Sequence, residues 1–130
     1  MSLTVTIKER HEGSYLVTLE GRLDTHTYLE FDGKMTPLLT GAARFLILDF
    51  GKLDYLSSMG MRSIIKVKKA VKSHNVDVVM INLQPQIEKL FEMVIALPTE
   101  SVFASIKEAD EYFDFIQKKE IEKLGNLKKN

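Results

Sequence analysis

The chain has 130 residues, the length of a single domain, and its 45% hydrophobic and 28% charged residues are typical of a globular protein. Eighteen basic and eighteen acidic residues cancel, so the positive excess of general nucleic-acid-binding or anionic-membrane-binding proteins is missing. There is no cysteine, which excludes a disulfide framework, a thiolate zinc site and a cysteine nucleophile.

The first residues lack the basic patch and apolar run of a signal peptide. The longest apolar stretches are far shorter than the roughly 20 residues that span a bilayer. There is also no lipidation motif, since residue 2 is Ser and cysteine is missing. We therefore expect a cytoplasmic protein.

Two β-like segments open the chain. Residues 4–9 and 15–20 each read as a strand, and the Glu-Gly-Ser connection between them predicts a hairpin. Gly21 is expected to end the second strand, and residues 22–27 to form a polar loop with helix-capping candidates. These candidates are Asp24, Thr25 and Thr27.

Apolar residues then recur at near-helical spacing in residues 29–39. Gly33 and Pro37 predict that this helix, which includes Leu29 on its apolar side, is short or irregular and closes at Gly41. The near-continuous apolar run at 45–50 is typical of a strand buried on both faces. Residues 51–56 are expected to be a loop.

The second half alternates helices and strands. An amphipathic helix follows Ser57 and Ser58, and residues 76–81 read as another buried strand. A helix begins at Pro85 and is broken at Pro98, a short strand is expected at 102–103, and a long helix with a frayed polar tail from Gly125 ends the chain.

This order predicts the α/β class: one domain with a central mixed sheet, made of the N-terminal hairpin plus parallel strands, packed with about four helices. Residues 1–115 are expected to form the domain proper, and residues 116–130 a helical extension and polar tail of the same domain. Neither an internal repeat nor an interdomain linker is evident.

Enzyme motifs are missing from the sequence. The three histidines share no metal-ligand spacing, and there is no nucleophile elbow, phosphate-binding loop or dinucleotide fingerprint. Asp49 ends a strand where a receiver domain would carry its phosphorylated aspartate, but the acidic pair that would hold magnesium is missing. We therefore expect a non-enzymatic protein with no metal or cofactor.

The helix after Ser58 carries a run of basic residues. Arg62, Lys66 and Lys69 share one helical face, and Lys68 and Lys72 share a neighbouring face. These side chains either attract an acidic partner or phosphates, or form a solvated helix face. No aromatic residue is interleaved with them, which weakens a nucleic-acid interpretation.

The most informative segment is residues 53–62, where Ser57 and Ser58 stand immediately before a helix and Gly60 lies in its first turn. Helix N-termini carry unpaired amide donors and a partial positive charge. A serine here can cap the helix, and the same place accommodates a phosphate. The two roles are compatible, because only one of the serines need be the cap.

At this segment the sequence resembles a STAS domain of the anti-sigma factor antagonist type, over roughly residues 4–115. The segment 16–24 resembles the family's strand followed by Gly-x-Leu-Asp, and 45–50 resembles its central strand. Residues 53–61 resemble the signature loop and helix start, and 82–91 the next strand end and helix. The four matches occur in the family's order.

The resemblance implies a regulatory function. The family's unphosphorylated antagonist binds an anti-sigma factor, often a serine kinase of the histidine-kinase-like ATPase type, and so releases a sigma factor. Phosphorylation of a Ser or Thr at the start of the second helix blocks that binding. A dianion at a docking surface shaped for a hydroxyl is unfavourable, which accounts for the block.

This sequence departs from the signature at the acceptor position. Aligned without gaps, Met59 takes the acceptor's place, Ser58 the preceding serine and Ser57 the aspartate. Ser58 is therefore the expected phosphoacceptor, with Ser57 as its alternative and as the expected N-cap; otherwise the domain is not switched here.

We expect the partner to dock on the start of this helix and on the Asp24 loop. The docking residues are Asp24, Ser57, Ser58, Met59, Gly60, Arg62 and Lys66. A side chain at Gly60 is expected to affect binding more than folding, and Met61 is expected in the core. The alternatives are a STAS module of another signalling assembly and an α/β domain that binds a small ligand or lipid head group through Lys66 or Lys69.

Overall fold

A computed structural model describes residues 2–96 and 105–129. Its sheet has four strands in the order β1-β2-β3-β4: β1 (Leu3–His11), β2 (Ser14–Leu23), β3 (Phe45–Leu56) and β4 (Asp77–Ile81). β1 and β2 form an antiparallel hairpin, whereas β2–β3 and β3–β4 are parallel pairs. The predicted mixed sheet is confirmed.

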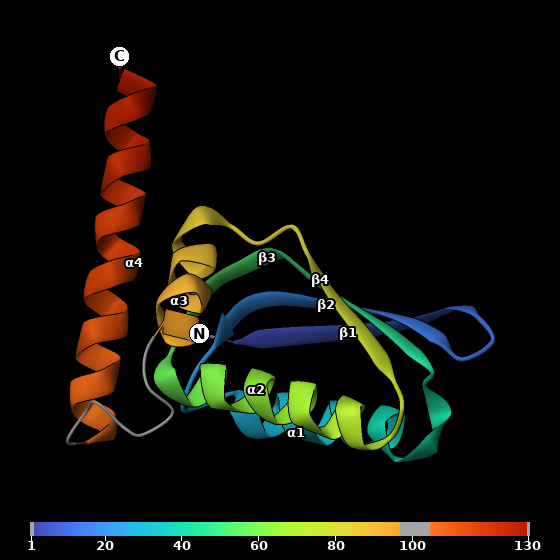
Figure 1. Ribbon diagram of the computed structural model, residues 1–130. Coiled ribbons are helices and arrows are strands. Elements are labelled where there is room, and N and C mark those ends of the chain that lie inside the picture. The colour runs from blue at the N-terminus through green and yellow to red at the C-terminus, as the bar shows by residue number, and fades with distance from the viewer. Residues whose placement is uncertain (1, 97–104, 130) are drawn as a thin grey trace.

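Helices cover one face and one end of this sheet (Figure 1). α1 (Tyr28–Pro37) and α2 (Ser58–Ser73) lie side by side under the sheet, and α3 (Pro85–Ala96) packs at the end of the strands. α4 (Ile106–Lys129) packs mainly on α3 and stands across that end. The expected break at Pro98 and the expected strand at 102–103 lie outside the described residues.

The core lies between the sheet and α1 and α2. Alternate residues of β3 point into it, and Leu46, Leu48 and Phe50 are fully buried. Two-residue periodicity places these side chains on the face that the helices cover. Phe31 and Ile64 meet them from α1 and α2.

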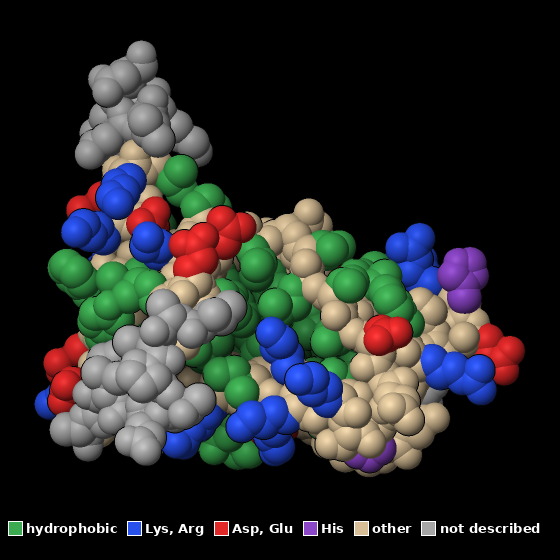
Figure 2. All heavy atoms as spheres, in the orientation of Figure 1, with side chains coloured by type: hydrophobic (Ala, Val, Ile, Leu, Met, Phe, Trp, Pro, Cys, Tyr) green, Lys and Arg blue, Asp and Glu red, His purple; other side chains and the backbone are tan. Residues whose placement is uncertain are grey.

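The opposite face of the sheet is more open than the apolar runs predict. Phe45 and Ile47 are only half-buried, and Val79 and Ile81 of β4 are 42% and 38% exposed. The prediction that both strands are buried on both faces is therefore wrong, because among the described helices α1 and α2 cover one face only and β4 is an edge strand. Figure 2 shows hydrophobic side chains reaching the surface above the helices.

Several predicted boundaries also need correction. β2 does not end at Gly21 but continues to Leu23, and residues 51–56 are not a loop but the second half of β3. Both strands continue because they pair with each other, with Leu23 opposite Leu56. Gly21 has φ +108°, and a Cβ there would overlap the carbonyl oxygen of Ser2, so the glycine permits a close approach of the chain rather than a strand end.

The helical segments confirm one expectation and depart from two others. α1 is short and passes into an irregular turn, η1 (Leu38–Ala42), with Gly41 at φ +142°, which confirms the predicted irregularity. Leu29 is not on the buried side but 69% exposed. The chain from Gly125 to Lys129 is not a frayed tail but the last part of α4, which also runs through residue 115 without a break.

Candidate functional site

The candidate site lies where β2 and β3 end side by side. Leu23 and Leu56 are register partners, so the Asp24 turn and the start of α2 leave the sheet at the same edge. The Ser57 amide donates to the Leu23 carbonyl at 3.0 Å and fixes the two segments together. The two stretches that the sequence assigned to docking are therefore neighbours.

Ser57 is the N-cap of α2, as predicted. Its side chain is 3% exposed, and its Oγ accepts a hydrogen bond from the Gly60 amide at 3.1 Å. The backbone of Ser57 is extended, at φ −88° and ψ 173°, as is usual for an N-cap. Its hydroxyl is thus buried and used inside the fold.

We expect Ser57→Ala to lower the free energy of unfolding by about 1 kcal/mol, because one first-turn amide of α2 loses its acceptor. For a domain of this size the thermal midpoint should fall by about 3–5 °C. Differential scanning calorimetry checks this, with Ser73→Ala at the exposed end of the same helix as the control. Equal midpoints for the two variants would contradict the capping role.

Ser58 is held by the C-terminal helix. It is half-exposed, and its amide and its Oγ both donate to Oδ1 of Asp110 on α4, at 3.0 and 2.5 Å. A carboxylate is favoured here because the N-terminus of α2 carries a partial positive charge. Two residues earlier, the Leu56 backbone is held by Gln117, which accepts from its amide and donates to its carbonyl, both at 2.9 Å.

Gly60 faces the end of β2. It is buried, and a Cβ there would overlap the Leu23 carbonyl oxygen and lie 2.9 Å from Cδ1 of Leu56. A side chain at Gly60 would therefore disturb folding, because α2 can approach the end of β2 only without one. The expectation that it affects binding more than folding stays a prediction. Met61 is 3% exposed and belongs to the core as predicted, which leaves Met59, half-buried, as the accessible methionine of this turn.

The Asp24 turn is internally satisfied. Asp24 is 8% exposed; its Oδ1 accepts from the His26 amide at 2.9 Å and its Oδ2 lies 3.5 Å from Nε of Arg22. Thr27 Oγ1 accepts from the Asp24 amide at 2.9 Å, and Thr27, not Asp24, is the N-cap of α1, without a side-chain cap bond. Asp24 thus shapes the turn that faces α2, while Thr25 and His26 are exposed.

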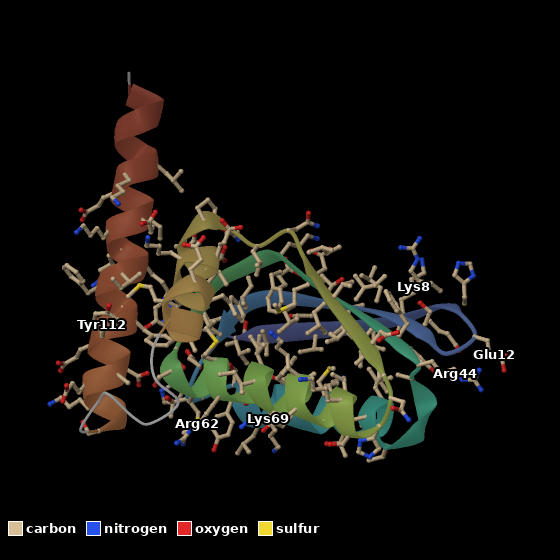
Figure 3. All side chains as sticks on the ribbon, viewed as in Figure 1. Lys8, Glu12, Arg44, Arg62, Lys69 and Tyr112 are labelled. Carbon is tan, nitrogen blue, oxygen red and sulfur yellow. The ribbon has the colours of Figure 1, made fainter. Side chains whose placement is uncertain are left out.

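The basic residues of α2 lie on its solvent side. Arg62 and Lys69 point away from the sheet (Figure 3), and basic side chains gather over α2 in the space-filling view (Figure 2). Lys66 is exposed, and its Nζ lies 3.6 Å from Oδ2 of Asp32 on α1. Lys66 therefore has an acidic neighbour inside the domain.

A shallow hollow of about 590 Å³ is lined in part by Asp110, the residue that binds Ser58, and three of its six lining residues are acidic. Burial raises the pKa of Tyr55 above its ordinary value, and the charges of Asp114, Asp110 and Asp24 add to this, while Arg22 opposes it. The Arg22 guanidinium stacks on the Tyr55 ring, 3.9 Å from its centre. The lining includes Thr25, Tyr55, Lys107, Asp110, Glu111 and Asp114.

The sequence analysis missed the contribution of α4. Gln117 had a detectable signal, because a glutamine four residues after Phe113 interrupts an apolar helix face, and a buried amide needs partners. Asp110 had none, since one acidic residue on a helix does not indicate which distant amide it caps. Among the described residues, His, Asp and Glu form no group of three that could hold a metal ion, and none of the helices there is long and apolar enough to cross a membrane.

The model of the STAS domain family matches residues 5–109, which is most of the chain and includes the Asp24 turn, the start of α2 and the first turn of α4. The chain belongs to the STAS domain family. Among related proteins, BtrV of Bordetella bronchiseptica, whose name describes an anti-sigma factor antagonist, is 26% identical over 93 residues, or 72% of this chain and 78% of BtrV.

Solved structures of anti-sigma factor antagonists show the same fold. The anti-sigma factor antagonist SpoIIAA in its unphosphorylated form superposes with a TM-score of 0.63 at 18% identity, over 70% of this chain and 80% of SpoIIAA. SpoIIAA of Bacillus in the phosphorylated form gives 0.62 at 18% identity, over 70% and 83%. An anti-sigma factor antagonist from Mycobacterium paratuberculosis gives 0.62 at 17% identity, over 82% and 90%.

Proposed function

We propose that this STAS domain is an anti-sigma factor antagonist, a non-enzymatic cytoplasmic protein that binds an anti-sigma factor and so releases a sigma factor. The partner in this proposal is a serine kinase of the histidine-kinase-like ATPase type. The names of BtrV and SpoIIAA support the assignment. The observation that carries it is the STAS fold with the start of α2 and the Asp24 turn at one accessible edge.

We further propose that the docking surface consists of accessible side chains, which buried residues of the same turn hold in position. Met59, Arg62 and Lys66 have solvent-accessible side chains and are placed to touch the partner. Asp24, Ser57 and Gly60 are buried and act on docking only by shaping the turn. A half-buried methionine beside basic residues suits a partner surface that combines an apolar pocket with acidic groups.

In the same proposal Ser58 is the phosphoacceptor. Ser58 is half-buried, whereas Ser57 is buried and its hydroxyl serves as the cap, so Ser58 is the more accessible of the two to a kinase. A phosphate at the first helical residue meets the amides of the N-terminus of α2 and remains compatible with folding. The accessible hydroxyl at position 58 thus compensates for the methionine at the usual acceptor position.

The alternative of an anionic ligand or lipid head group is less favoured at this edge. The hollow beside Ser58 contains three carboxylates, and Lys66 is already paired with Asp32. An anion would be repelled by the first and would have to compete for the second. A thermal-shift panel of nucleotides and anionic lipids tests the alternative directly.

We expect tagged wild-type protein, expressed in the organism that carries the gene, to co-purify with an ATPase-type serine kinase. Ser58→Ala should retain this protein, and Ser58→Asp should lose at least about tenfold of it, because a fixed anion enters a surface shaped for a hydroxyl. Lys8→Asp is the control: it adds an anion on β1, at the far end of the sheet from α4 (Figure 3).

Incubation of the captured kinase with ATP should place phosphate on Ser58, as read by phosphopeptide mapping. Phosphate on Ser57 would reverse the assignment of the two serines. Capture without phosphorylation would mean that the domain docks but is not switched here. Enrichment of proteins that contain no anti-sigma factor would refute the proposed function.

A further inference from the structure

The last described helix borders the surface on which the partner is proposed to dock. The inward face of α4 carries Ala109, Phe113 and Gln117, which are all buried and spaced one turn apart. The apolar pair packs near α3, where Phe91 and Leu90 are also buried. The polar member, Gln117, binds the backbone of Leu56, the last residue of β3. α4 is therefore held by apolar packing near α3 and by hydrogen bonds at the edge of the site.

One anion position exists at the start of α2, and α4 fills it. Oδ1 of Asp110 accepts both the amide and the hydroxyl of Ser58, so this carboxylate neutralises the positive end of the helix. The side-chain half of this contact requires a hydrogen-bond donor at position 58. An unmodified serine supplies that donor.

A phosphate on Ser58 would compete with Asp110 for the same position. The phosphoserine oxygens are acceptors at neutral pH, so the hydroxyl donor is lost and two anions face each other. Glu111 and Asp114 line the same hollow and add to the repulsion, whereas Lys107 is the basic residue in the lining that opposes it. The phosphate is covalently placed at the amides, and Asp110 is the group that must leave.

We propose that α4 forms one side of the partner-binding surface, held in place by the hydroxyl of Ser58 and released by negative charge at that position. The proposal rests on the proposed function for the identity of this surface. With the hydroxyl of Ser58 in place, α4 lies against the β3–α2 turn; with negative charge at position 58, α4 leaves this turn and keeps its contacts with α3. Phosphorylation then changes the docking surface in two ways, by adding charge and by removing a helix.

Hydrogen–deuterium exchange of the full chain tests the release of α4 without any partner. In Ser58→Asp, amides of the first turns of α4 should exchange at least about tenfold faster than in wild type, the factor that one hydrogen bond to a charged group contributes to an equilibrium. Ser58→Ala adds no charge and keeps the backbone donor to Asp110, so α4 should stay protected to within about threefold. Ser73→Asp places the same charge at the far end of α2 and should leave α4 unchanged.

Adding Asp110→Asn to Ser58→Asp should restore most of the protection, because it removes the repulsion and supplies an amide donor. A double-mutant cycle of the urea midpoints of these variants gives the same coupling and covers the case in which Ser58→Asp loosens more than α4. Unchanged or increased protection of α4 in Ser58→Asp, for example through Lys107, would overturn the proposal, as would a lack of coupling with Asp110→Asn. Because the readout contains no anti-sigma factor, it can fail while the capture experiment succeeds, and the reverse.

Discussion

Gly60→Ala is expected to lower the free energy of unfolding by about 2 kcal/mol, although alanine is the better helix former. The gain in helix propensity is about 1 kcal/mol, but the new methyl group would overlap the Leu23 carbonyl oxygen. Because this oxygen belongs to rigid backbone, the cost is at the upper end of the range for overpacking, about 3 kcal/mol. The thermal midpoint should fall by about 6–10 °C. Gly60→Val should be worse.

Gly33→Ala is the matched control for this experiment. Gly33 lies inside α1, is exposed, and would meet nothing within 4 Å of an added Cβ. This substitution should raise the thermal midpoint, because only the propensity gain remains. If Gly60→Ala were equally stabilising, the close approach of α2 to the end of β2 would be refuted.

Gln117→Met is expected to lower the free energy of unfolding by about 2–4 kcal/mol in urea titrations. Methionine has a similar length and fills the space, but the Leu56 amide and carbonyl both lose their partner in a buried place. Each unsatisfied buried group costs about 1–3 kcal/mol. The loss is bounded by the cost of undocking α4, which would let water reach Leu56.

Glu122→Met serves as the comparison, since Glu122 is exposed on the same helix. It should shift the urea midpoint by no more than experimental error. A similar loss in both variants would mean that methionine disturbs α4 generally, and that the bonds from Gln117 to Leu56 contribute little.

Local sequence pattern predicted the elements well and their surroundings less well. The hairpin, the alternation of strands and helices, and the cap at Ser57 follow from signals within a few residues of each other, and the structure confirms them. The apolar run of β4 was misleading, because a run of Val, Met and Ile does not show whether a second layer covers the strand. The exposed face of β4 depends on where the helices go, which is decided by the whole fold.

The candidate site shows the same division. Sequence pattern identified Ser57, Ser58 and Asp24, because each lies where a predicted strand ends or a predicted helix begins. The burial of Gly60 depends on the neighbouring strand end at Leu23, and the partner of Ser58 is 52 residues away at Asp110. Such contacts leave no trace in a single sequence, since nothing near Ser58 encodes the helix that returns to it.

The outer half of α4 acts as a lever arm, because a small tilt of the docked turns moves the end of the helix by a larger distance. Among the side chains of α4 that the structure describes, Gln117 is the last one that is buried. At 1.5 Å per residue the helix backbone continues about 18 Å beyond it to Lys129. A tilt of about 10° at the docked turns therefore displaces the tip by about 3 Å. The chain has no cysteine, so Gly125→Cys and Lys8→Cys would give two unique attachment points for spin labels, one on the lever and one on the far end of the sheet. The distance between them would register small rotations of the helix as measurable displacements.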